Sequence, residues 1–153
     1  MIGFARILCP VDFSDTAVHA FRYACALAEK FGAELTVVHV IEVTPVFAGL
    51  EGMPQLNLYA EAEQAAQRQL QELTQGASAK PKTEILRGGT YKSILAYAEE
   101  HGSDLIVMGT HGRSGLEYAF FGSVTERVMR RAPCPVLIVR PPRAAEKGHA
   151  ERK

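Results

Sequence analysis

Four glycines within fifteen residues are the strongest sign of ligand chemistry in this chain. The segment GTHGRSGLEYAFFGS (109–123) follows the apolar run SDLIVM and precedes VTERVMRRA, whose pattern is helical. Its spacing is Gly109-x2-Gly112-x9-Gly122-Ser123. A glycine has no Cβ, so the backbone there can approach a ligand closely or turn through positive φ. A loop that only joins a strand to a helix does not need so many glycines.

The residues that follow these glycines suit a phosphate group. Gly122 and Ser123 fall at the start of a predicted helix, where backbone N–H groups lack partners and the helix dipole favours an anion. The hydroxyls of Ser123 and Thr125 could donate hydrogen bonds. His111 and Arg113 could add charge or further hydrogen bonds.

A local explanation needs no ligand. Ser123 with Glu126 three residues later also fits a capping box, and loop glycines can serve turns alone. Neither G-x4-G-K-[ST] nor G-x-G-x2-G occurs in the chain, so two familiar phosphate loops are excluded. From the residues alone, phosphate binding and a local turn both stay open.

Strand-like and helical segments alternate along the chain. Helices are expected from Ser14 to Gly32, along a stripe from Tyr59 to Leu73, from Thr90 to Gly102 and from about 123 to 132. Strands are expected at 5–11, 34–43, 82–88, 104–109 and 135–139. The run at 82–88 is a weaker strand, but the near-continuous apolar character of the others predicts a parallel sheet covered by helices on both faces. Ligands of such sheets bind beyond the carboxyl ends of the strands, where the glycine segment begins.

Composition and charge exclude several classes of protein. The 153 residues are expected to form one domain over 1–141, followed by a flexible polar tail at 142–153. Lys plus Arg and Asp plus Glu both number 17, which argues against a partner nucleic acid. No run nears the roughly 20 apolar residues of a membrane span, and no secretion signal is evident, so a cytoplasmic protein is expected. The spacing of the three cysteines and five histidines predicts neither a disulfide framework nor a metal site built from side chains.

The combined motifs resemble those of the universal stress protein family over about residues 4–140. The resemblance rests on the glycine motif together with ILCPVDFSD, VVHVIE, DLIVMGTHGRSG and CPVLIV. It implies a Rossmann-like α/β fold with an open five-stranded parallel sheet of order 3-2-1-4-5. It also implies ATP in the crevice, with Mg²⁺ or Mn²⁺ bound through the phosphates, and a homodimer formed through the last strand (135–139).

The resemblance also implies which residues line the ATP site. Those near the adenosine are Pro10, Val11, Asp12 and Val40, and those at the floor are Met108 and Gly109. Those around the phosphates are Gly112, Gly122, Ser123, Val124 and Thr125. Asp12 has a physical rationale of its own, because a carboxylate at a strand's end can accept hydrogen bonds from ribose hydroxyls. Its alternative role is that of a turn residue.

The implied function is an ATP-binding regulatory module in the stress response, without efficient catalysis. No nucleophile–base pair emerges from the spacing of the residues. The alternatives are a nucleotide-dependent enzyme, with slow ATP hydrolysis or transfer, and an interaction module with AMP or an empty pocket. The loop at 44–58 and the aromatic residues Tyr118, Phe120 and Phe121 have no assigned role.

Overall fold

The computed structural model describes residues 1–42, 55–111 and 121–141 of the chain. Strands and helices alternate in the predicted order, with boundaries close to those expected. They are β1 (Arg6–Pro10), α1 (Asp15–Phe31), β2 (Glu34–Ile41), α3 (Gln55–Thr74), β3 (Lys82–Arg87), α4 (Thr90–Glu100), β4 (Leu105–Gly109), α5 (Ser123–Arg131) and β5 (Val136–Val139). The predicted tail at 142–153 and most of the loop at 44–58 lie outside the described residues.

The five strands form one parallel sheet in the order β3-β2-β1-β4-β5, which confirms the expected topology. The central strand is β1, whose Leu8 is in register with Thr36 of β2 and Ile106 of β4. The strand order reverses between β1 and β4, so the carboxyl ends of these two strands flank the crevice where ligands of open α/β sheets bind.

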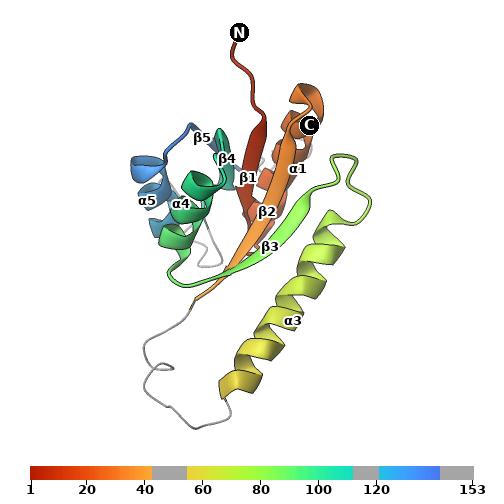
Figure 1. Ribbon diagram of the computed structural model, residues 1–153, viewed down its shortest axis with the longest axis vertical. Coiled ribbons are helices and arrows are strands. Elements are labelled where there is room, and N and C mark those ends of the chain that lie inside the picture. Colours follow the sequence, from red (N-terminus) through yellow and green to blue (C-terminus); the bar gives the residue numbers. More distant parts are fainter. Residues whose placement is uncertain (43–54, 112–120, 142–153) are drawn as a thin grey trace, which may run out of the picture.

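Helices cover both faces of the sheet (Figure 1). Ile7 and Cys9 of β1 pack in the cluster that includes α1 and Leu70 of α3. The alternate residue, Leu8, packs in the cluster that includes α4 and α5. Because successive strand residues point to opposite faces and both faces are buried at the centre of the sheet, β1, β2 and β4 are largely apolar, whereas the edge strand β3 is not.

The ends of α1 follow from local chemistry. The Oγ of Ser14 accepts a hydrogen bond from the backbone N–H of Ala17 at 3.3 Å, which caps the helix. Gly32 ends the helix at φ 64°, a conformation that glycine adopts without steric cost. Both predicted ends are therefore confirmed. Among the described helices, none has the length and apolar character to cross a membrane.

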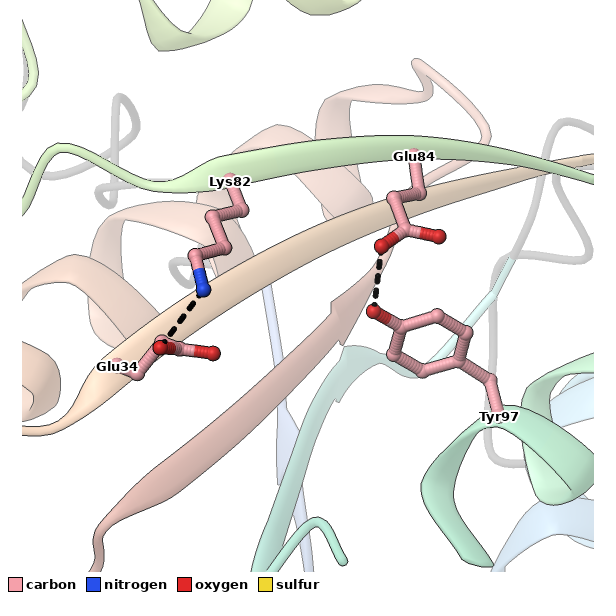
Figure 2. A network of polar contacts seen from close by, with 4 residues as sticks. All are labelled: Glu34, Lys82, Glu84 and Tyr97. Atoms are coloured by element: carbon pink, nitrogen blue, oxygen red, sulfur yellow. Dashed lines mark hydrogen bonds and ion pairs between the residues drawn. The ribbon is translucent and has the colours of Figure 1, made fainter. Parts of the chain in front are cut away.

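A polar network joins α4 to the edge of the sheet, away from the crevice (Figure 2). Tyr97 of α4 donates a hydrogen bond to Oε1 of Glu84 on β3 at 2.9 Å, while Lys82 and Glu34 form an exposed ion pair at 2.8 Å. Burial of Tyr97 and its hydrogen bond to Glu84 raise the pKa of Tyr97 to about 12. The hydrogen bond from the neutral phenol of Tyr97 to Glu84 therefore links α4 to the edge strand β3.

Candidate functional site

A cleft of about 580 Å³ lies beyond the carboxyl ends of β1, β2 and β4. Every predicted site residue that the structure describes lines it: Pro10, Val11, Asp12, Val40, Met108, Gly109, His111, Gly122, Ser123, Val124 and Thr125. Gly112 and Arg113, together with Tyr118 and Phe120, lie outside the described residues. The cleft has the volume of a small-molecule site, and it lies where the order of the strands reverses.

The cleft also has walls that sequence reasoning missed. Ala62, Ala65, Ala66 and Gln69 of α3 form one of these walls. Others come from His39 and Glu42 at the end of β2 and from Thr90 and Ile94 of α4. Glu42 could have been found as a carboxylate that directly follows a buried strand, as Asp12 was.

The loop after β1 holds Asp12 at the rim of the cleft. Its carboxylate accepts hydrogen bonds from the backbone N–H of Ser14 at 3.0 Å and from the Ser14 hydroxyl. The ring of the next residue, Phe13, lies 4.6 Å from that of His39, and Phe13 has φ 64°. Nδ1 of His39 lies 2.8 Å from the carbonyl oxygen of Val11 and must donate, since a carbonyl can only accept. Asp12 thus shapes the turn and lines the cleft as well.

The start of α5 forms the opposite wall. Its N-cap is Gly122, and no side chain of the described residues caps it. The carboxylate of Glu126 instead accepts a hydrogen bond from Nη2 of Arg130 at 2.8 Å. The capping box between Ser123 and Glu126, the alternative that needs no ligand, is therefore wrong. The first backbone N–H groups of α5 have no carbonyl partner within the helix, because no helical turn precedes them.

The two motif glycines that the structure describes differ in why glycine suits each position. A Cβ on Gly109 would lie 3.0 Å from the backbone carbon and oxygen of Thr16, so close packing of α1 on β4 by itself favours glycine there. Gly122 has φ −60° and ψ 157°, which any residue adopts, so the motif does not need Gly122 for positive φ.

The hydroxyl of Thr125 does not donate to a phosphate as the sequence predicts, because it has another partner. It donates to the carbonyl oxygen of Gly109 at 3.0 Å, and the residue is only 4% exposed. Because the hydroxyl has one proton, it cannot also donate to a phosphate. Ser123 is exposed at the mouth of the cleft, so its hydroxyl remains a candidate donor.

His111 contributes a ring nitrogen that has no partner among the described residues. Its Nδ1 lies 2.9 Å from Oγ1 of Thr110, and its backbone carbonyl accepts a hydrogen bond from the Thr16 hydroxyl. Its Nε2 is buried and has no hydrogen-bond partner in the described part of the chain. A buried polar atom is costly to leave unpaired, so Nε2 is suited to a ligand that enters the cleft.

The nearby thiol cannot act as a nucleophile. Cys9 is fully buried, and this burial raises the pKa of its thiol far above the usual range. Over residues 1–42, 55–111 and 121–141, no three His, Cys, Asp or Glu side chains gather closely enough to hold a metal ion. The described site therefore presents a ligand with hydrogen-bonding side chains and with the first backbone N–H groups of α5.

The model of the universal stress protein family matches residues 3–140. The chain belongs to this family. It is similar to the universal stress protein MJ0531 of Methanocaldococcus jannaschii, with 39% identity over 144 residues that cover 92% of this chain and 84% of that protein. The family resemblance of the sequence motifs is thereby confirmed.

Solved structures of family members share the fold. The universal stress protein UspA from Lactobacillus plantarum superposes with a TM-score of 0.74 at 34% identity, covering 92% of this chain and all of that one. The structure of MJ0577 from Methanocaldococcus jannaschii superposes with a TM-score of 0.80 at 29% identity, covering 92% and 98%. The predicted doubly wound α/β fold is therefore that of the family.

Proposed function

We propose that this universal stress protein binds an adenine nucleotide in the cleft, ATP with Mg²⁺ or Mn²⁺, and acts as a nucleotide-dependent regulatory module in the stress response. One observation carries the proposal. The start of α5, which no described side chain caps, the carboxylate of Asp12 and an apolar floor that includes Met108 line the same cleft. These are complementary to the phosphate, ribose and base of a nucleotide.

Hydrogen-bond donors in the cleft support the proposal that the phosphates bind at the start of α5. The first backbone N–H groups of α5 face no helical carbonyl, and the helix dipole favours an anion there by about 0.3–1 kcal/mol. The Ser123 hydroxyl and Nε2 of His111 supply further polar atoms in the same cleft. This arrangement can bind a phosphate without a lysine.

A divalent cation fits the charge of the cleft. Among its described lining residues, Asp12 and Glu42 are acidic and none is Lys or Arg. The several negative charges of ATP would be repelled by these carboxylates, and Mg²⁺ or Mn²⁺ on the phosphates would reduce the repulsion. The cation would be held by the phosphates, as the sequence resemblance implies.

Two more distant structures with the same fold hold adenine nucleotides. One is a universal stress protein in complex with cAMP, at 23% identity and a TM-score of 0.65. The other is a universal stress protein from Archaeoglobus fulgidus in complex with dAMP, at 22% identity and a TM-score of 0.62. At this identity the likeness is one of fold, so the proposal depends on the residues of this chain.

Two measurements test the proposal. Mass spectrometry of freshly purified, denatured protein should detect an adenine nucleotide. Added ATP with Mg²⁺ at 100 times its dissociation constant should stabilise the fold by about 2.7 kcal/mol, which raises Tm by about 5–10 °C. Adenosine should raise Tm less, because it has no phosphate for α5. If no nucleotide co-purifies and millimolar ATP leaves Tm unchanged, the proposed function fails.

We also propose a homodimer through β5. This strand pairs with β4 on one side, and the described chain supplies no strand on its other side. Leu137, near the middle of β5, is 37% exposed. Pairing with a second copy of β5 would satisfy the open backbone groups and cover this side chain.

A further inference from the structure

The cleft has a carboxylate just after β2, a strand that β1 separates from β4 and so from the start of α5 that follows β4. Glu42 directly follows β2 and lines the cleft. The hydroxyl of Thr90, the first residue of α4, donates to Oε1 of Glu42 at 2.6 Å. A backbone hydrogen bond from Gly88 to Ile41 at 3.1 Å joins the same two segments. The carboxylate of Glu42 is therefore held in place at the rim.

An apolar slot leads to this carboxylate. Val38 and Val40 precede Glu42 at alternate positions of β2, and both pack in the cluster that includes α4 and α5. Ile94 and Met108 are buried in that cluster, and Val124 is partly buried against it. All five apolar residues also line the cleft. A flat ring could lie against these side chains with its edge toward Glu42.

We propose that Glu42 accepts a hydrogen bond from the 6-amino group of adenine and thereby selects adenine over 6-oxo purines. The inference rests on the proposed function and adds the base preference of that site. A carboxylate is an acceptor only, so it attracts an amino group and repels the carbonyl oxygen of hypoxanthine or guanine. It also repels phosphate, so the phosphates face α5 and the base faces β2.

The test compares ATP with ITP, whose base differs at the 6-position by an oxo group. Dissociation constants with Mg²⁺ are measured by calorimetry for the wild type and for Glu42→Gln. The wild type should bind ATP at least about tenfold more tightly than ITP, because ITP leaves the carboxylate without its donor and adds a repulsive oxygen. Glu42→Gln should lose most of this preference, because its amide can donate to the oxo group while still accepting from Thr90.

Glu100→Gln is the matched control, since it makes the same chemical change on an exposed residue at the end of α4, outside the cleft. It should keep the wild-type ratio of ATP to ITP affinity. Melting curves show that each variant is folded. If both nucleotides bind and the ratio is the same in wild type and Glu42→Gln, the role of Glu42 is overturned while the nucleotide site stands. If neither nucleotide binds the wild type, the proposed function fails and this inference fails with it.

Discussion

Thr125 and Gly109 are joined by a hydrogen bond from the threonine hydroxyl to the glycine carbonyl, 3.0 Å long. With the backbone hydrogen bond from Gly122 to Thr110 at 2.8 Å, it fixes the start of α5 to the end of β4. The wall that carries the first N–H groups of α5 is thus set by the fold before any ligand binds.

Thr125→Val should therefore lower stability and spare nucleotide binding. The substitution keeps the shape of the side chain but removes its buried hydrogen bond to the Gly109 carbonyl, which costs about 0.5–1.5 kcal/mol of unfolding free energy. The backbone N–H groups of α5 are unchanged, so the ATP-induced shift in Tm, measured from the variant's own baseline, should equal that of the wild type.

Ser123→Ala should have the opposite effect. Because Gly122 is the N-cap and no side chain of the described residues caps α5, losing this exposed hydroxyl should change unfolding free energy by no more than about 0.5 kcal/mol. The ATP-induced stabilisation should fall by about 0.5–1.5 kcal/mol, for one lost hydrogen bond. An unchanged ATP response would remove Ser123 from the site.

Gly122→Val should abolish the ATP-induced shift, because the branched side chain fills space in the cleft beside the first N–H groups of α5. The backbone at Gly122 suits any residue, so the variant should fold with a loss of about 1 kcal/mol or less. The shift is measured by thermal melting with and without ATP. A full response in this variant would show that the phosphates do not lie at the start of α5.

The stability that Tyr97 provides should be lost at high pH. The pKa of Tyr97 is raised from 10.0 to about 12 in the folded chain, so its neutral form, which donates to Glu84 (Figure 2), is favoured by folding. Its contribution is complete below pH 10 and falls as the pH rises toward 12. The difference in unfolding free energy between wild type and Tyr97→Phe, from urea titrations, should shrink across this range.

Tyr23→Phe controls for general alkaline effects, because Tyr23 is 49% exposed on α1. A difference between wild type and Tyr97→Phe that stays constant from pH 8 to 12 would contradict the prediction.

Leu137→Glu should convert the proposed dimer into a monomer, because a charge on the open edge of β5 opposes pairing with a second copy. Sedimentation at micromolar concentration measures the change. Tyr23→Glu, which places the same charge on α1, should remain dimeric. A wild-type chain that sediments as a monomer would contradict the proposed assembly.

Local patterns were sufficient to predict the strands and helices and a parallel sheet with a ligand site at its carboxyl edge, whereas the order of the strands came from the family resemblance. The cap at Ser14, the helix end at Gly32 and the apolar strands are short-range features that one segment specifies. The contacts that sequence reasoning missed join distant segments: Thr90 to Glu42, and Gly109 to Thr16. The Thr125 hydroxyl donates to the carbonyl of Gly109, sixteen residues earlier in the sequence. This partner is evident only in the folded chain, so the sequence alone predicts a phosphate donor instead. Such contacts depend on how the helices pack on the sheet, which the hydrophobic periodicity of the sequence does not specify.

The tight fit between Gly109 and the backbone of Thr16 changes how the glycine motif should be used in comparing family members. A side chain at the first glycine would displace α1 whether or not a nucleotide is bound. The packing of α1 therefore favours that glycine even in a relative that has lost nucleotide binding. Diagnosis of binding from sequence should give more weight to the second half of the motif, because the backbone conformation of Gly122 is one that any residue adopts.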